Sequence, residues 1–289
     1  MSCNDDYEEI NEAKTNMDHI YDAPDPRAYF SELKKLNYII PTSAKPVFSK
    51  LISMLRRNRT DSVRVLDIGC SYGVNAALLK HDLSMPELYQ HWSQDRMAEA
   101  THAEVVEYEQ QYFDQLGEPE NIEVIGLDQA KNAVEFAEEI GLLDEGLAMN
   151  LETEALPDKA RSDLASVDLV MSTGCVGYVT EKTFDTLMPA VTQEEPPWLA
   201  NFVLRMFPFD KIEGLLDQYG YATEKLEGEV FVQREFASQE EQTQIIKQLS
   251  EIGIDSTGME AQGHLLAEFY LSRPKDQVKQ MPLEELLRV

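Results

Sequence analysis

One short turn in the sequence carries residues whose types and spacing suit ligand binding. In SVRVLDIGCSYGVNAALLK, residues 62–80, an apolar run ends in Asp67 and is followed by Gly69, Ser71 and Gly73 before a helical pattern begins. Glycine has no Cβ atom to block a ligand and accepts a positive φ, and serine is nearly as small while adding a hydroxyl. A carboxylate here repels phosphate groups and suits a cationic amine or sulfonium. The turn therefore predicts a cofactor site with a preference for positive charge.

The elements around this turn alternate between strand and helix. Apolar runs predict strands at 63–68, 122–128, 146–151, 167–173, 199–207, 228–237 and 265–273. Helical patterns are expected at 74–80, 131–143, 181–191, 209–220 and 239–254. This order predicts an α/β fold with a doubly wound, seven-stranded, mostly parallel sheet that has an antiparallel edge.

The chain also divides into expected regions. Residues 1–60, where Pro24, Pro26, Pro41 and Pro46 mark breaks, are expected to form a helical N-terminal cover. Residues 61–289 form the expected cofactor-binding domain, with a helical insertion at about 80–121. Ligands of doubly wound sheets bind beyond the carboxyl ends of the strands, where the quoted turn lies.

The stretch VLDIGCSYG, residues 65–73, resembles the first motif of the class I (Rossmann-like) S-adenosylmethionine-dependent methyltransferases. It lacks the third glycine of the dinucleotide fingerprint GxGxxG. The resemblance implies S-adenosyl-L-methionine as the cofactor. It also implies cofactor contacts from the ends of four strands, at Asp67, Gly69, Ser71, Gly73, Asp128, Gln129, Asn150, Leu151, Thr173 and Gly174.

The resemblance gives these residues different roles. Asp128 would accept hydrogen bonds from both ribose hydroxyls, with Gln129 beside it, since a carboxylate offers two acceptor oxygens. The third strand end would reach the adenine through Asn150, Leu151 or Glu152, of which Asn150 is best able to bind the ring edge. The acid at the second strand ordinarily follows the turn by about 20 residues. Here the interval is much longer, which is why an insertion is expected.

Candidates for the substrate pocket come from three segments. Arg27 and Tyr29 lie in the Pro-rich segment near the N-terminus, Trp92 lies in the insertion, and Tyr178 follows the fourth motif. Arg27 could grip a carboxylate or pair with a nearby aspartate, and the aromatic residues could line a pocket, pack on the core or form a dimer contact. No general base is named, and the five scattered histidines do not predict a metal site.

Composition limits the partners. The formal net charge of −28 disfavours nucleic acid, and no apolar run approaches the roughly 20 residues that span a bilayer. The acidic start of the chain lacks the pattern of a secretory signal, so a cytoplasmic protein is expected, with a homodimer left open.

These observations predict methyl transfer from S-adenosylmethionine to a small-molecule acceptor, on oxygen or nitrogen, such as a metabolite or natural-product precursor. A non-catalytic, cofactor-binding or partner-activating protein is the alternative, with the tail 276–289 as an amphipathic helix on its interaction surface. An NAD(P)-dependent oxidoreductase is a third reading and lacks its glycine fingerprint.

Overall fold

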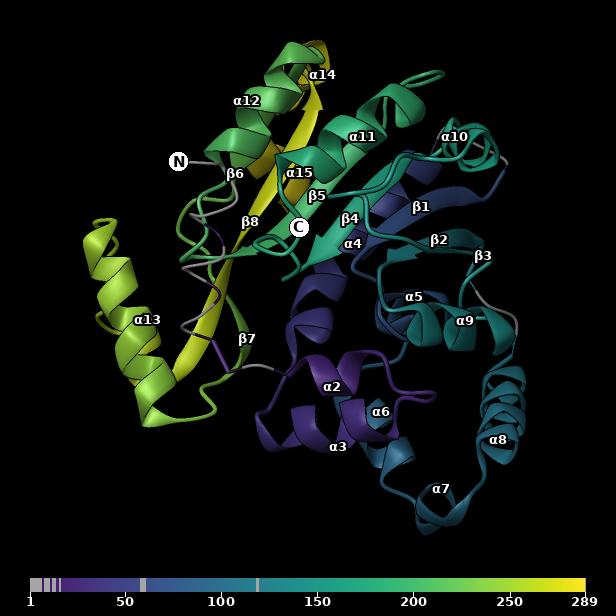
Figure 1. Cartoon of the computed structure of the whole chain (residues 1–289). Coiled ribbons are helices and arrows are strands. Elements are labelled where there is room, and N and C mark those ends of the chain that lie inside the picture. Colours follow the sequence, from purple (N-terminus) through teal and green to yellow (C-terminus); the bar gives the residue numbers. More distant parts are fainter. Residues whose placement is uncertain are drawn as a thin grey trace.

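A mixed sheet of eight strands forms the centre of the molecule (Figure 1). The computed structural model describes residues 7, 11, 14–15, 17–57, 61–117 and 120–288. The strand order is β3-β2-β1-β4-β5-β8-β6, and β7 also pairs with β8. The α/β doubly wound fold expected from the sequence is therefore present.

The strands are β1 (Val63–Ile68), β2 (Ile122–Asp128), β3 (Glu145–Ala148), β4 (Leu169–Thr173), β5 (Trp198–Leu204), β6 (Tyr221–Lys225), β7 (Phe231–Glu235) and β8 (His264–Pro274). The helices before β2 are α2 (Asp18–Tyr21), α3 (Arg27–Lys35), α4 (Ile40–Arg56), α5 (Val74–Lys80), α6 (Met85–Trp92), α7 (Asp95–Glu99) and α8 (His102–Gln115). The later helices are α9 (Lys131–Glu139), α10 (Asp158–Leu164), α11 (Glu181–Val191), α12 (Asp210–Gln218), α13 (Gln239–Glu251), α14 (Lys275–Gln280) and α15 (Leu283–Leu287), with a 3-10 turn, η1, at Glu260–Gln262.

The sheet has a parallel half and an antiparallel half. β1 to β5 pair in parallel, whereas β8 runs antiparallel to β5, β6 and β7. β6 and β7 lie end to end along one side of β8, because β6 pairs with residues 270–274 and β7 with residues 264–267. The eighth strand, β6, was not predicted, since only Tyr221 of its five residues is fully buried and the hydrophobic alternation is weak.

Helices cover both faces of the sheet. Along β1, Val63 and Val65 pack into the apolar layer under α4, α5 and α9, while Leu66 and Ile68 pack into the layer under α10, α11 and α12. Side chains of a strand alternate between faces, so β1 is buried on both sides. Of the two charged residues in this strand, Arg64 is half-buried and Asp67 is fully buried.

Local signals explain several helix boundaries. Thr101 and Glu104 form a reciprocal capping box at the start of α8, and the hydroxyl of Thr180 accepts a hydrogen bond from Lys182 N–H at the start of α11. The break expected at Pro46 is wrong, because α4 continues through it and buries its apolar face. The predicted tail helix is likewise divided into α14 and α15, since Pro282 interrupts it.

The N-terminal helices pack against the helices between β1 and β2, below the sheet in Figure 1. The Phe30 and Trp92 rings stack at 5.3 Å between centroids. Arg27 forms an ion pair with Asp25 at 2.7 Å and donates to the carbonyls of Met97 and Ala100 at 3.2 and 2.8 Å. Arg27 and Trp92 therefore join the cover to the insertion instead of facing a substrate pocket, the role considered for them above.

Replacing Arg27 tests this joint. We expect Arg27→Met to lower the free energy of unfolding by about 1–3 kcal/mol, because Asp25, which is buried, and two carbonyls lose their donor. Guanidinium denaturation measures the change. Lys35→Met is the matched control, since Lys35 pairs only with exposed Glu32 at the surface and should shift stability by about 0.5 kcal/mol or less. Equal free energies of unfolding for the two variants would contradict the claim that Arg27 links the N-terminal helices to the insertion.

Candidate functional site

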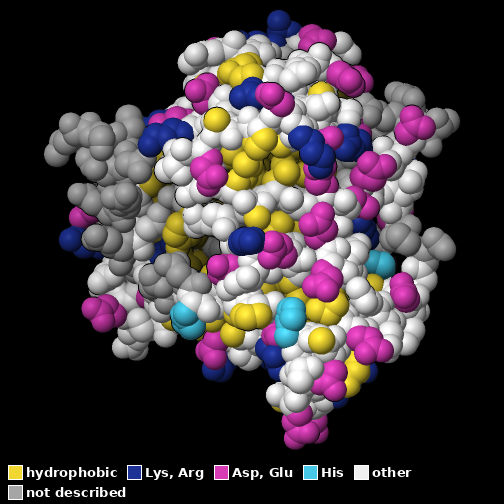
Figure 2. All heavy atoms as spheres, turned by 45° about the vertical axis from the view of Figure 1, so that its right-hand side comes forward, with side chains coloured by type: hydrophobic (Ala, Val, Ile, Leu, Met, Phe, Trp, Pro, Cys, Tyr) yellow, Lys and Arg dark blue, Asp and Glu magenta, His cyan; other side chains and the backbone are white. Residues whose placement is uncertain are grey.

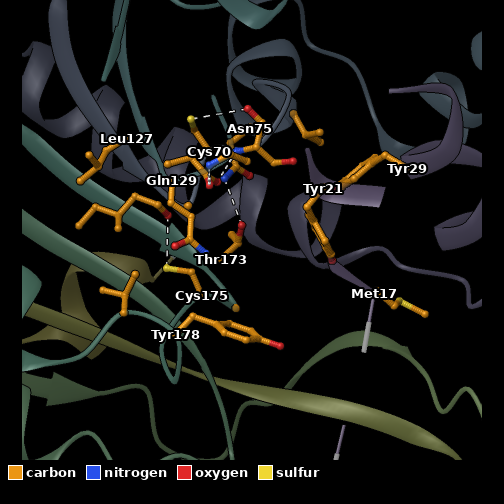
Figure 3. A pocket seen from close by; sticks show the side chains of 18 of the residues that line it. Met17, Tyr21, Tyr29, Cys70, Asn75, Leu127, Gln129, Thr173, Cys175 and Tyr178 are labelled. Atoms are coloured by element: carbon orange, nitrogen blue, oxygen red, sulfur yellow. Dashed lines mark hydrogen bonds between the residues drawn. The ribbon is translucent and has the colours of Figure 1, made fainter. Parts of the chain in front are cut away.

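A cavity of about 520 Å³ lies at the carboxyl ends of β1, β2 and β4 (Figure 3). Its walls come from the sheet edge, from the N-terminal helices and from β7 and β8. Most of the predicted site residues line it, namely Gly69, Ser71, Asp128, Gln129, Asn150, Leu151, Thr173, Gly174, Tyr29 and Tyr178. Asp67, Gly73, Arg27 and Trp92 are not among its lining residues.

The turn after β1 runs through left-handed backbone at three positions. Gly69, Ser71 and Gly73 have φ values of +73°, +48° and +72°. A Cβ atom on Gly69 would lie 2.7 Å from the Cβ of Cys175, so this glycine allows the turn to pack against the loop after β4. A Cβ on Gly73 would lie 3.1 Å from Ala137 in α9. The glycines thus allow the positive φ values, one of the two reasons expected from the sequence, and they also permit close packing inside the protein, while Gly69 lines the cavity.

Asp128 connects the end of β2 to this turn. Its carboxylate accepts hydrogen bonds from the backbone N–H groups of Ser71 and Ala130, each at 2.9 Å. Burial raises the pKa of Asp128, and hydrogen bonds from the backbone N–H groups of Ala130, Ser71 and Gln129 oppose that shift. A carboxylate offers about four lone-pair sites, so the group keeps acceptor capacity for a ligand. The hydroxyl of Ser71 is also buried at the cavity and has no partner among the described residues.

Asp67 lies beneath the turn, behind the cavity wall. The side-chain amide of Asn75, on α5, donates to both oxygens of Asp67 at 3.1 and 3.3 Å and to Thr173 Oγ1 at 3.1 Å. Burial raises the pKa of Asp67 to about 7, and the nearby Asp128 carboxylate adds to the shift. Asp67 therefore stabilises the turn through its hydrogen bonds with Asn75. In its ionised form it also adds negative charge behind the cavity wall.

Polar groups at the end of β3 are largely satisfied by one another. Asn150 donates from Nδ2 to Gln129 Oε1 at 3.0 Å and accepts from Glu152 N–H at 3.0 Å. The Glu152 carboxylate accepts from Thr180 N–H, Thr180 Oγ1 and Thr183 Oγ1 at 2.8, 2.7 and 2.6 Å. Glu152 thus stabilises the start of α11, which leaves Asn150 and Gln129 as the polar groups at this end of the cavity.

Tyrosines from the N-terminal helices line the opposite end. Tyr29 is buried, and its ring meets those of Tyr21 and Tyr38 edge to face at 5.6 and 6.4 Å. Tyr178 is 53% exposed at the cavity rim, where Lys14 Nζ lies 4.2 Å from its ring centroid. Figure 3 shows Tyr21 and Tyr29 across the hollow from Thr173 and Tyr178.

None of the insertion residues that the structure describes lines the cavity. The aromatic side chains of the insertion pack within the protein: His91 contacts buried Glu109 and stacks on Tyr112 at 3.7 Å between centroids. His264 starts β8 and does not line the cavity. Of the roles considered for the aromatic residues of the insertion, packing inside the protein is therefore the one that these side chains have.

Four residues important to the site were not identified from the sequence: Asn75, Tyr38, Gln233 and Arg234. Asn75 follows the glycine turn directly on α5, so its position could have been inferred. The other three come from distant segments, and local patterns do not reveal them. Arg234 is bound bidentately by Glu241 at 2.9 and 2.7 Å, so its charge is matched inside the protein.

The surface carries the strong acidity of the sequence. On the described part of the face in Figure 2, acidic side chains are spread widely with basic ones among them. Among the described residues, no cluster of histidine, cysteine or acidic side chains has the geometry to hold a metal ion. None of the helices in that part of the chain is both long and apolar enough to cross a membrane.

Comparisons with known proteins give a limited result. Neither a protein-family model nor a curated protein sequence matches the chain. Similar solved structures include the plantazolicin methyltransferase BpumL in complex with SAH, with 12% identity, 94% of this chain and 98% of that chain covered, and a TM-score of 0.47. The plantazolicin methyltransferase BamL has 13% identity, the same coverage and a TM-score of 0.45. The [4+2]-cyclase SpnF has 12% identity, coverage of 78% and 80%, and a TM-score of 0.39.

The buried carboxyl of Asp67 predicts a pH dependence of stability. Its folded-state pKa of about 7 lies above the ordinary 3.8, so the folded protein holds this proton more tightly than the unfolded chain does. The free energy of unfolding should therefore fall as pH rises from about 4 to 7, by about 1.4 kcal/mol per pH unit in the middle of that interval.

Asp67→Asn removes this group while keeping its shape. Between pH 5 and 7, we expect the wild type to lose about 2–3 kcal/mol more stability than Asp67→Asn in denaturant titrations. Asp114→Asn, on the exposed face of α8, is the control and should follow the wild type. Parallel pH profiles for the wild type and Asp67→Asn would show that the Asp67 carboxyl titrates normally.

Proposed function

We propose that this protein transfers a methyl group from S-adenosyl-L-methionine to a small-molecule acceptor, on oxygen or nitrogen. The observation that carries the proposal is Asp128, whose carboxylate lines the cavity while Ser71 N–H of the left-handed turn holds it in place. A carboxylate with free lone pairs beside a small-residue turn suits a ribose diol next to an aminoacyl group. The motif resemblance at residues 65–73 supports the same cofactor.

The other residues that line the cavity are assigned to the remaining parts of the cofactor. Gln129, Asn150 and Leu151 would hold the adenine, since they combine polar amides with a buried apolar side chain. Ser71, with its unpartnered hydroxyl, and Thr173 would hold the methionine part. Asp67 and Asp128 supply negative charge near the turn, which favours a sulfonium and disfavours a pyrophosphate.

Positioning is the main contribution that these residues can make to the reaction. When bound, S-adenosylmethionine supplies a methyl group on a cationic sulfur; that sulfur keeps the bonding electron pair as the methyl passes to the acceptor, and the O–H or N–H proton of the acceptor leaves to solvent. The chain has to align the acceptor atom with the sulfur–methyl bond and exclude water. Tyr29 and Tyr38 have pKa values raised well above 10 by burial, so they remain neutral and act as donors or walls, not as bases.

Calorimetric titration of S-adenosylmethionine into the protein tests the proposal. We expect wild-type binding and a loss of about 1.5–3 kcal/mol in Asp128→Ala, which is about one to two decades in dissociation constant, because hydrogen bonds to a charged group are lost. Asp114→Ala is the matched control on the exposed face of α8 and should bind as the wild type does.

The other readings give different outcomes in the same experiment. No binding of S-adenosylmethionine by the wild type would overturn the proposal, and tight binding of NADH instead would support an oxidoreductase. Binding that is weakened by Asp128→Ala, without methyl transfer to any acceptor tried, would favour a non-catalytic, cofactor-binding protein.

A further inference from the structure

One end of the cavity contains a polar side chain, Gln233, whose amide oxygen no described residue binds. Gln233, on β7, lines the cavity and is only 9% exposed. Its Oε1 atom is buried and has no hydrogen-bond partner among the described residues. Leaving a buried amide oxygen unpaired costs about 1–3 kcal/mol, so such a group is expected to have a partner in the working protein.

The backbone around Gln233 is shaped to present this side chain. β7 pairs Val232 with Leu266 and Arg234 with Leu265, so the register shifts and Gln233 is left out of the ladder. Its carbonyl accepts instead from Ile39 N–H of the N-terminal cover at 2.8 Å. Bulges of this kind change the direction of a side chain and are frequent next to active sites.

A glycine makes room for the amide. A Cβ atom on Gly174 would lie only 2.5 Å from Gln233 Nε2, and the φ of Gly174 is +73°. Gly174 directly follows β4, beside Thr173, which is the end of the cavity assigned above to the methionine part. The Gln233 amide therefore lies next to the place where a methyl group would be transferred.

The surroundings indicate what kind of molecule meets this amide. The cavity lining across from Thr173 contains the rings of Tyr21 and Tyr29, and Tyr38 also lines the cavity, so a bound molecule meets flat apolar surface. Two basic side chains line the described part of the cavity: the guanidinium of Arg234 is bound by Glu241, and Lys14 lies over the Tyr178 ring at the rim. A cationic acceptor would be repelled by the sulfonium of the proposed cofactor.

From this geometry we propose that Gln233 determines acceptor specificity by accepting a hydrogen bond from an O–H or N–H group of a flat, uncharged, hydroxy- or amino-substituted aromatic molecule. The inference rests on the proposed function, because it places the acceptor beside bound S-adenosylmethionine. Gln233 is a binding residue here and takes no proton.

Fluorescence titration of protein saturated with S-adenosylhomocysteine tests this role. The probes are 2-naphthol and 2-methylnaphthalene, which have nearly the same shape but differ in the O–H donor. In the wild type, 2-naphthol should bind more tightly than its apolar partner, and in Gln233→Met the ratio of the two affinities should fall five- to tenfold, the range of one neutral hydrogen bond. The anion 2-naphthoate should bind more weakly than 2-naphthol.

Two further variants keep the test specific. Gln233→Glu retains an acceptor oxygen and should retain the preference for 2-naphthol, whereas Gln244→Met, on the exposed face of α13, should change nothing. Unchanged affinity ratios in Gln233→Met, or no binding of 2-naphthol by the wild type, would overturn the inference. S-adenosylhomocysteine affinity is measured on the same samples. If the wild type does not bind S-adenosylhomocysteine, the result counts against the proposed function. If it binds S-adenosylhomocysteine but Gln233→Met leaves the ratio of the two probe affinities unchanged, the result counts against this inference alone.

Discussion

The hydrogen bonds of one buried amide hold the site together. Asn75 is 5% exposed and joins three elements, because it extends from α5 to Asp67 in β1 and to Thr173 at the end of β4. Between Asp67 and Asn75 the backbone passes through left-handed conformations that an unsupported loop would rarely keep. Asp128 supports the same turn from β2 through Ser71 N–H. The carboxyl edges of three parallel strands are thereby fixed relative to one another.

This arrangement explains why the part of the cavity at the strand ends, where the cofactor is proposed to bind, can be predicted from the sequence. β1 and α11 have the predicted bounds, Val63–Ile68 and Glu181–Val191. Both follow from short patterns of apolar residues, glycines and capping groups. The parallel pairing of β1, β2 and β4 then brings their carboxyl ends to one edge. Asp128 consequently lies near the turn even though a long insertion separates them in the sequence.

The acceptor half depends on contacts between distant segments, which local patterns do not encode. From the sequence, Arg27 could bind either an anion in a pocket or a nearby aspartate. The structure shows that it binds Asp25 and two backbone carbonyls, because the N-terminal segment packs against α7. Trp92 likewise stacks on Phe30. Gln233 has no motif at all, since its direction follows from a bulge set by the pairing of β7 with β8 and by Ile39.

The two halves also differ in what a mutation can change. A substitution in the turn disturbs Asp67, Asn75 and Asp128 together, because each is held by the next, and effects of residues in such contact are not additive. The acceptor wall is made of side chains from the N-terminal helices and β7 that share few hydrogen bonds with that network. Its residues can therefore change with less effect on the turn. Under the proposed function, acceptor specificity would be a property of the N-terminal helices and β7, separable from cofactor binding.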